Sequence, residues 1–225
     1  MSEQYSVSPN GEKFVLPKPG DYKAEFESIK KRVKAERAKG REIVVVMGVG
    51  FVGAVMAAIV ADTVDDKGKP SKFVIGMQRP SLRSFWKIPM LNRGVSPVKA
   101  EDPEVDPMIE RCVKQKKTLM ATYTYDVLKL ADVVVVDVQC DYIKEELGNV
   151  RAGQTDMAAL EASLGVIAEH IQPEALVLIE TTVAPGTTEQ VAYPIMKKAF
   201  VRRGIKTDPL LAHSYERVMP GRNYV

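Results

Sequence analysis

The stretch Glu42-Ile-Val-Val-Val-Met-Gly-Val-Gly-Phe-Val-Gly53 predicts a buried strand, a tight glycine turn and the start of an apolar helix that reaches Asp62. The turn has the pattern GxGxxG. In this pattern Gly48 permits the sharp turn, Gly50 lets the backbone approach a pyrophosphate, and Gly53 lets the helix pack closely. The sequence therefore predicts a dinucleotide-binding turn, with a glycine-rich turn that binds nothing as the alternative. The expected cofactor-binding residues of the turn are Gly48, Gly50, Phe51, Val52 and Gly53.

The composition is that of an ordinary globular protein, with 225 residues of which 45% are hydrophobic. A net charge of +3, from 32 basic and 29 acidic residues, is too balanced to indicate a nucleic-acid partner. Two cysteines and two histidines offer neither a disulfide framework nor a metal site. Apolar runs are far shorter than the roughly 20 residues of a membrane span, and the polar start does not resemble a signal peptide. We therefore expect a cytoplasmic protein without a membrane segment.

The first 40 residues form an extension before the glycine-turn stretch. Residues 1–20 contain prolines and glycine and predict an extended or poorly ordered arm. Residues 21–39 predict a helix with one apolar stripe, and its other faces are rich in lysine and arginine. This basic surface indicates a docking helix for an acidic partner or, as we prefer, a solvated helix packed by one stripe. We expect residues 41–225 to form the dinucleotide-binding domain.

From residue 42 onward, predicted strands and helices alternate. The helix at residues 155–171 is the clearest, with Thr155 as its expected N-cap, whereas residues 80–102 predict a long irregular connection. Under the right-handed crossover rule, the alternation gives an α/β fold: a Rossmann-like doubly wound parallel sheet with helices on both faces, plus an N-terminal helical extension. The expected strands are 42–47, 72–77, 118–122, 132–138, 175–181 and 206–212. The expected helices that connect them are 54–62, 106–117, 126–130, 155–171 and 187–203.

Ligands of such sheets bind beyond the carboxyl ends of the strands, where several loops meet. The loops expected to converge on one crevice are those after Met47, Met77, Val138, Thr181 and Ala212.

The residue that reads the adenosine ribose normally follows the second strand and is acidic in NAD-binding proteins. This chain has Gln78 followed by Arg79 at that place, with Ser81, Arg83 and Ser84 nearby. Gln78 is able to hydrogen-bond a ribose hydroxyl, whereas the Arg79 guanidinium suits a 2′-phosphate. NAD and NADP therefore both stay open, and a third interpretation leaves Arg79 and Arg83 as exposed loop charges.

Four motifs, in order and at family-like spacing across residues 42–221, resemble the UDP-glucose/GDP-mannose dehydrogenase family. They are Gly48-Val-Gly-Phe-Val-Gly53, Leu91-Asn-Arg-Gly-Val-Ser-Pro97, Glu180-Thr-Thr-Val-Ala-Pro-Gly-Thr-Thr188 and Ser214-Tyr-Glu-Arg-Val-Met-Pro-Gly221. The last motif is most similar to the branch that oxidises UDP-N-acetylhexosamines. The resemblance implies an NAD-binding domain of an enzyme whose partner is a nucleotide-sugar substrate.

The family's reaction converts the sugar C6 alcohol to a carboxylate through two hydride transfers to NAD and a cysteine thioester. The resemblance implies that Thr182 orders the reacting water or hydroxyl and that Glu216 is the general base for thioester hydrolysis. It also implies a nicotinamide-side contact at Val138. The alternative for Thr182 is a strand-end hydroxyl that caps the next helix, and for Glu216 an ion pair with Arg217.

The chain departs from the family pattern in several places. The turn Val138-Gln-Cys-Asp141 replaces a small-residue/Thr-Pro turn, and Tyr215 replaces a proline before Glu216. The family continues into a central helix, through which its dimers form, and a C-terminal domain that carries the cysteine nucleophile. We therefore expect residues 1–225 to be part of a longer homodimeric enzyme, inactive alone and monomeric or weakly associated.

Neither cysteine lies in the family's cysteine motif, and we interpret both as structural. Cys140 would lie at the crevice, where Lys144 would lower the pKa of its thiol; Cys112 lies in a lysine-rich helix. A non-catalytic dinucleotide-binding module is the alternative to the enzyme. Another two-domain dehydrogenase, of hydroxyacyl or sugar-acid type, would share the glycine turn but not the last two motifs.

Overall fold

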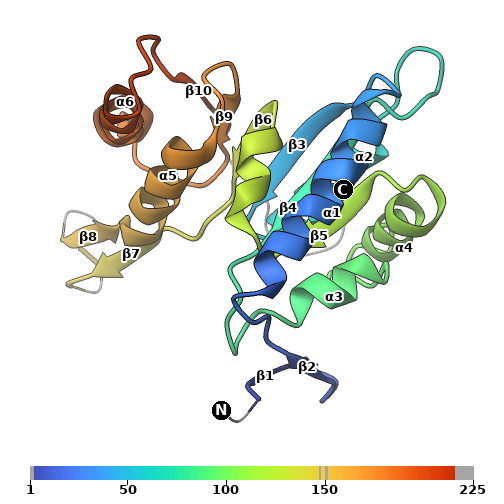
Figure 1. The fold of residues 1–225 in the computed structure, drawn as a ribbon. Coiled ribbons are helices and arrows are strands. Elements are labelled where there is room, and N and C mark those ends of the chain that lie inside the picture. Colours follow the sequence, from blue (N-terminus) through green and yellow to red (C-terminus); the bar gives the residue numbers. More distant parts are fainter. Residues whose placement is uncertain (1–2, 147, 150–151, 216–225) are drawn as a thin grey trace.

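The computed structural model describes residues 3–146, 148–149 and 152–215, and its centre is a six-stranded sheet (Figure 1). The strand order is β5-β4-β3-β6-β9-β10, and all neighbouring strands are parallel. The predicted doubly wound parallel sheet is therefore confirmed. The strands are β3 (Glu42–Met47), β4 (Lys72–Met77), β5 (Leu119–Thr122), β6 (Val133–Val136), β9 (Leu176–Ile179) and β10 (Leu210–His213).

The sheet is buried on both faces, which explains the continuous apolar runs in its strands. In β3, Ile43 and Val45 face one hydrophobic core, whereas Val44 and Val46 face the other. Because successive side chains of a strand point to opposite faces, a strand covered on both sides needs apolar residues at every position. The four consecutive valines of β6 follow the same rule.

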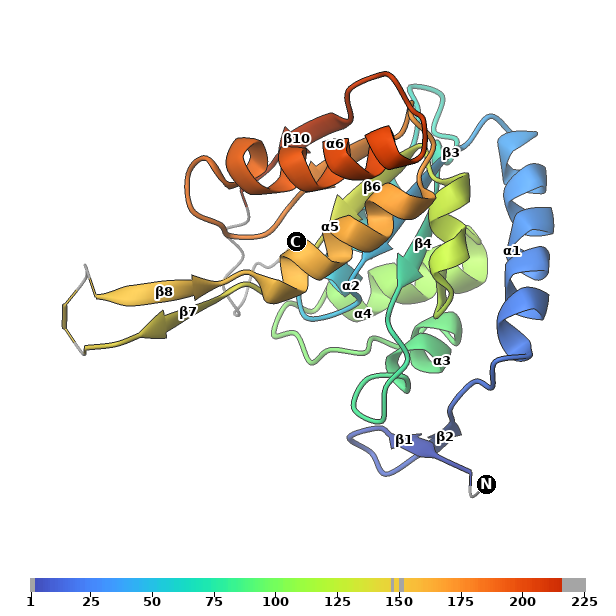
Figure 2. The ribbon, with the colours of Figure 1, turned by 60° about the vertical axis from the view of Figure 1, so that its left-hand side comes forward.

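Helices cover the two faces (Figures 1 and 2). One core contains side chains of α1, α5 and α6, and the other contains side chains of α2, α3 and α4. The α-helices are α1 (Asp21–Arg37), α2 (Gly53–Asp62), α3 (Lys87–Asn92), α4 (Val105–Glu110), α5 (Ala158–His170) and α6 (Tyr193–Arg202). Shorter helical segments are η1 (Arg111–Gln115), η2 (Tyr125–Leu130) and η3 (Thr188–Ala192). Within the described ranges, no helix is long and apolar enough to cross a membrane.

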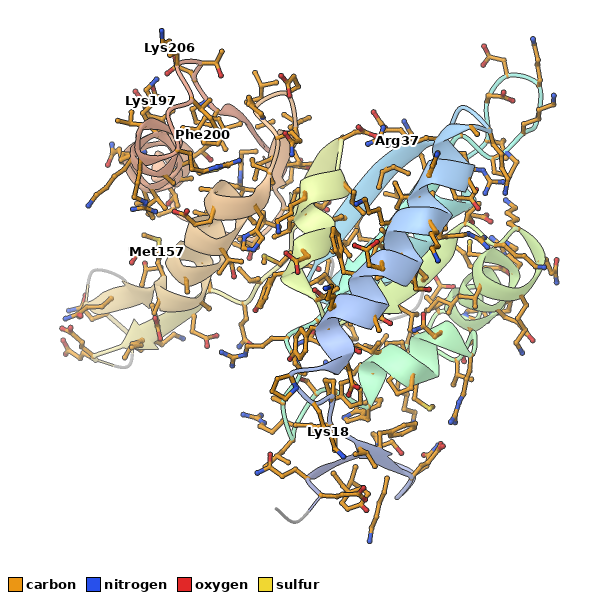
Figure 3. All side chains as sticks on the ribbon, in the orientation of Figure 1. Lys18, Arg37, Met157, Lys197, Phe200 and Lys206 are labelled. Carbon is orange, nitrogen blue, oxygen red and sulfur yellow. The ribbon has the colours of Figure 1, made fainter. Side chains whose placement is uncertain are left out.

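Helix α1 covers the part of the sheet that the crossover from β5 to β6 leaves open. That crossover contains only the short segment η2, whereas α1 places Ile29 and Val33 in the same core as the side chains of β3 and β4. At the carboxyl end of α1, Arg37 donates to the Leu130 carbonyl at 2.9 Å and pairs with Asp132 at 2.7 Å (Figure 3). The N-terminal helix is therefore packed into the core rather than lying loosely beside it.

The segment before α1 differs from the expected loose arm. It forms an antiparallel hairpin of β1 (Tyr5–Val7) and β2 (Lys13–Val15). Its turn is closed by Ser8, whose hydroxyl accepts the Glu12 N–H at 3.1 Å, and by Gly11, whose φ of 84° is one that glycine tolerates. The strands are three residues each, too short for an alternating pattern to appear in the sequence.

Two other sequence expectations were wrong. The segment 80–102 contains the helix α3. The segment after β6 forms a hairpin of β7 (Asp141–Lys144) and β8 (Gly153–Asp156), which extends away from the sheet (Figure 2). Thr155 lies in β8, so it does not cap α5. The N–H of Ala158 is instead accepted by the Asp156 carboxylate at 3.0 Å.

Asn92, at the end of α3, covers part of the edge strand β5. Its side-chain amide donates to the Ala121 carbonyl at 2.9 Å, and its amide oxygen accepts the Ala121 N–H at 2.7 Å. These are the two backbone groups that an adjacent strand would bind. The Asn92 side chain therefore pairs with β5 at this residue as a further strand would.

A pair of matched substitutions tests whether α1 is part of the core. Val33 on α1 is 3% exposed, and Val201 on α6 is 63% exposed. We expect Val33→Ala to lower the free energy of unfolding by about 2 kcal/mol because it leaves a cavity. Val201→Ala changes this free energy by no more than about 0.5 kcal/mol. Equilibrium denaturation in urea measures both, and equal values would contradict the packing of α1.

Candidate functional site

Two adjoining hollows open beyond the carboxyl ends of β3 and β6, where the winding of the sheet reverses. Their volumes are about 490 and 320 Å³, and they share Gly50, Asp137, Val138 and Gln139. The loop after β4 and helix α5 complete the larger hollow, and the loop after β9 completes the smaller one. Doubly wound sheets bind their ligands at this position. The loop after β10, expected here, lines neither hollow within the described residues.

The glycine turn is packed so tightly on the end of β6 that two of its glycines have no room for a side chain. A Cβ at Gly48, where φ is +105°, would lie 2.1 Å from the Asp137 carbonyl oxygen. A Cβ at Gly53 would lie 1.9 Å from the Gly48 carbonyl oxygen and 2.6 Å from Asp137 Oδ2. Both distances are far inside van der Waals contact. Gly53 thus serves the packing of the turn on itself and on Asp137.

Gly50 differs from these two glycines because nothing lies within 4 Å of a Cβ built on it. It lines both hollows, and it lies three residues before Gly53, where α2 begins with N–H groups that lack intrahelical acceptors. The protein itself therefore gives no reason for a glycine here, whereas a phosphate that approaches the backbone does. This open cradle fits the pyrophosphate of a dinucleotide.

Gln78 supports the glycine turn from the end of β4. Its amide oxygen accepts the Val49 N–H at 3.2 Å, and its amide nitrogen donates to Ser84 Oγ at 3.4 Å. The expected ribose contact is therefore engaged with the protein. Arg79, the next residue, is exposed and lines the larger hollow, and no hydrogen bond or ion pair with another described residue holds its guanidinium.

Tyr125 also lines the larger hollow, close to Arg79. Burial raises the pKa of the Tyr125 phenol, and the positive charge of Arg79 acts in the opposite direction. The ring of Tyr125, at the start of η2, and the guanidinium of Arg79, after β4, form a suitable surface for an adenine and its ribose, because both present flat faces and the guanidinium attracts anions.

The smaller hollow contains Thr182, which is exposed, together with Phe51 and Val52. The adjacent Thr181 is 7% exposed, and its hydroxyl donates to the Val138 carbonyl at 2.7 Å. This bond ties the loop after β9 to the loop after β6. Thr181 thus has a structural role, and Thr182 presents its side chain to the hollow.

Neither cysteine has the environment of an activated nucleophile. Cys112 is fully buried, and burial together with the Asp62 carboxylate raises the pKa of its thiol to about 12. Cys140 lines the smaller hollow, but burial raises the pKa of its thiol as well. The charges that act on Cys140 are those of Asp141 and Asp156, which also raise the pKa, so the expected lowering by Lys144 was wrong.

The structure brings almost all of the predicted site residues to one place. Gly53 lies beneath the glycine turn, and Glu216 lies outside the described residues. The predicted residues that line the two hollows are Gly48, Gly50, Phe51, Val52, Gln78, Arg79, Val138 and Thr182.

Sequence reasoning missed the wall that α5 supplies. This wall is made of small and medium side chains at helical spacing, on a helix that we predicted but did not expect to line the site. Asp137 was missed because it follows the four valines and was assigned to the strand. The missed lining residues are Tyr125, Asp137, Gln139, Ala159, Ala162, Ser163 and Val166.

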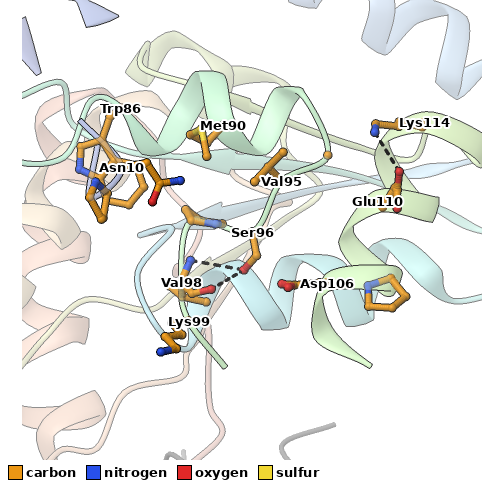
Figure 4. Close-up of a pocket in the computed structure, with 14 residues that line it drawn as sticks. Asn10, Trp86, Met90, Val95, Ser96, Val98, Lys99, Asp106, Glu110 and Lys114 are labelled. Carbon is orange, nitrogen blue, oxygen red and sulfur yellow. Dashed lines mark hydrogen bonds and ion pairs between the residues drawn. The ribbon is translucent and has the colours of Figure 1, made fainter. Parts of the chain in front are cut away.

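A larger cavity, of about 570 Å³, lies between the N-terminal hairpin, α3 and α4 (Figure 4). Trp86, Met90 and Val95 give it an apolar wall, and the Glu110–Lys114 ion pair also lines it, with a separation of 2.9 Å. None of the predicted cofactor residues lies in its lining. It is therefore separate from the candidate site.

Comparison with known proteins agrees with this geometry. Residues 42–225 match the model for "UDP-glucose/GDP-mannose dehydrogenase family, NAD binding domain". The chain is 31% identical over 179 residues to UDP-N-acetyl-D-mannosamine dehydrogenase of Pyrococcus horikoshii, covering 80% of this chain and 37% of that protein. It is 27% identical over 173 residues to GDP-mannose 6-dehydrogenase of Pseudomonas aeruginosa, covering 73% and 35%.

Among solved structures, the chain resembles the NDP-N-acetyl-D-galactosaminuronic acid dehydrogenase of Methanosarcina mazei Go1. The TM-score is 0.68 at 32% identity, over 85% of this chain and 38% of that one. The expected similarity to the UDP-N-acetylhexosamine branch is thus confirmed. The chain spans little more than a third of the length of these relatives.

Substitutions at two glycines distinguish a position kept free for a ligand from a position where the fold itself leaves no room for a side chain. We expect Gly50→Val to change the free energy of unfolding by no more than about 1 kcal/mol, because no protein atom lies within 4 Å of the Cβ that it adds. We expect the same variant to weaken dinucleotide binding by about 100-fold or more, because the side chain occupies the place of the pyrophosphate. Urea denaturation and calorimetric titration measure the two quantities.

Gly53→Val is the contrasting variant. Its side chain would overlap the Gly48 carbonyl, and we expect a loss of about 3 kcal/mol or more in the free energy of unfolding. A folded Gly50→Val variant with unchanged affinity would refute the site.

Proposed function

Because the chain belongs to the UDP-glucose/GDP-mannose dehydrogenase family, we propose that residues 42–225 hold the dinucleotide of a nucleotide-sugar 6-dehydrogenase. The observation that carries this proposal is the open cradle at Gly50, next to two glycines that leave no space for a side chain. The larger hollow would hold the adenosine half of the cofactor. The smaller hollow, with Val138 and Thr182, would hold the nicotinamide half.

The proposed substrate is a UDP-sugar, oxidised at C6 from the alcohol to the uronic acid. Bound NAD supplies the chemistry of hydride acceptance, used twice. In this proposal Thr182 orders the reacting hydroxyl or water beside the nicotinamide position, and Glu216 takes the proton from the hydrolytic water. The similarity to UDP-N-acetyl-D-mannosamine dehydrogenase supports an N-acetylated sugar.

Residues 1–225 alone are expected to lack activity, because the covalent step needs a positioned thiolate. The raised pKa values of Cys112 and Cys140 support this expectation. Reduction of NAD by the full-length protein with UDP-N-acetylhexosamines, compared with the same assay on residues 1–225, tests it.

A non-catalytic dinucleotide-binding module is the second candidate. It is favoured by Gln78, which supports the glycine turn, and by the turn after β6, which continues into the hairpin of β7 and β8. Cofactor binding without any turnover by the full-length protein would support this module.

NAD is the cofactor that the family indicates, and NADP stays open because Arg79 faces the larger hollow. We expect Arg79→Ala to weaken NADP binding by about tenfold or more, since a charge-assisted hydrogen bond contributes about 1.5–3 kcal/mol. Binding of NAD would change by less than about twofold. Arg83→Ala is the control, because Arg83 is an exposed arginine of the same loop that lines neither hollow. Equal effects of Arg79→Ala on the binding of both cofactors would contradict a contact between Arg79 and the 2′-phosphate, and Arg79 would then be an exposed charge of the loop.

We also propose that the full-length protein is a cytoplasmic homodimer and that residues 1–225 alone are monomeric or weakly associated. This follows from the family's dimer helix, which comes after the last of the four motifs. Light scattering of residues 1–225 at micromolar concentration measures the state, and a tight dimer would contradict the proposal.

A further inference from the structure

The N-terminal hairpin lies against the segment that leads from the end of β4 into α3. Ser6 of β1 is fully buried and Phe14 of β2 is 8% exposed, whereas Tyr5 and Val15, on the opposite face, are exposed. The hairpin is attached at its far end as well, because Glu12 pairs with Arg93 at 2.6 Å. The hairpin therefore has one face built to pack on this segment.

Ser6 connects the hairpin to the segment by two hydrogen bonds. Its hydroxyl donates to the Leu82 carbonyl at 2.8 Å and accepts the Trp86 N–H at 3.2 Å. A fully buried hydroxyl that both donates and accepts is costly to replace, because its removal leaves the buried Trp86 N–H and the partly buried Leu82 carbonyl without these partners. Residues far apart in the sequence are thus joined at one atom.

The 79–86 loop carries this connection to the candidate site. Ser84 Oγ lies 2.7 Å from Ser81 Oγ, donates to the Arg79 carbonyl at 3.2 Å, and accepts from the Gln78 amide at 3.4 Å. The other end of the Gln78 amide accepts the Val49 N–H of the glycine turn. Ser6 is therefore connected to the glycine turn in three steps: its hydrogen bond to Leu82, the backbone from Leu82 to Ser84, and the hydrogen bonds from Ser84 through Gln78 to Val49.

We infer that the N-terminal hairpin positions the 79–86 loop for the dinucleotide, with Ser6 as the positioning residue and Arg79 as the residue that it presents to the adenosine ribose. This inference rests on the proposed function. No hydrogen bond or ion pair with another described residue holds the Arg79 guanidinium, whereas its backbone carbonyl is held by Ser84, so the backbone is the part of Arg79 that the loop positions. The extension before residue 42 then supports the cofactor site from outside its lining, although it lies outside the residues that match the family model.

Hydrogen exchange tests the contact without any ligand. In Ser6→Ala, we expect the amides of Ser84, Phe85 and Trp86 to exchange about fivefold faster or more, because one or two hydrogen bonds that hold the loop are lost. Thr118→Ala is the matched control. Thr118 also has a fully buried hydroxyl, but it lies just before the amino end of β5, whereas the hollows lie beyond the carboxyl ends of the strands. Unchanged exchange in a folded Ser6→Ala variant would overturn the inference.

Titration with NAD and NADP tests the positioning role. We expect Ser6→Ala to weaken NADP binding by about three- to tenfold and NAD binding less, so that the ratio of the two affinities changes. In an Arg79→Ala background, Ser6→Ala should no longer change this ratio by more than about twofold, because the presented side chain is absent. A purely structural role would lower both affinities together and leave the ratio unchanged.

The outcomes separate the two proposals. Binding by the wild-type protein with an unchanged ratio in Ser6→Ala overturns the positioning role only. No binding of either dinucleotide by the wild-type protein overturns the proposed function, and the positioning role with it. Should Ser6→Ala fail to fold, Phe14→Leu loosens the same hairpin through its other strand and is measured in its place, with the same criteria.

Discussion

The close contact between the glycine turn and Asp137 is the constraint on which the rest of the site depends. The backbone of the turn passes so near the end of β6 that no side chain fits at Gly48 or Gly53. This contact exists only because β3 and β6 are neighbours at the centre of the sheet, with the earlier strands on one side and the later ones on the other. The arrangement of the strands thus determines where α2 begins and where the two hollows open.

Most of the fold could be predicted from the sequence because its signals are local. Strands buried on both faces leave unbroken apolar runs, and Asp21–Arg37 has the spacing of a packed helix. The failures have physical reasons too. The hairpin of β1 and β2 depends on contacts with residues about 80 positions away, and Thr155 belongs to a hairpin whose strands are mostly polar. A short window of sequence shows neither these distant contacts nor the pairing of two polar strands.

The site was predictable to the extent that it is made of loops that follow recognised strands. Gly50 and Thr182 were found from motifs, and the structure gives Gly50 the open space that its role needs. Gln78 shows the limit of such reasoning, because its position suits a ribose contact while its amide is engaged with Val49. A motif predicts which loop lies at the site. The hydrogen-bond partners of each side chain in that loop depend on how segments distant in the sequence pack around it.

Asn92 has a consequence for the behaviour of the molecule in a crowded solution. A parallel sheet ends in strands whose free backbone groups attract other chains, and proteins avoid amyloid-like growth by blocking those edges. Here the amide of one side chain takes both hydrogen-bonding positions of Ala121. Asn92 belongs to a helix, so its side chain does not present a further row of strand backbone groups with which another chain could pair. At Ala121, the edge of the sheet is therefore closed to pairing with a strand of another chain.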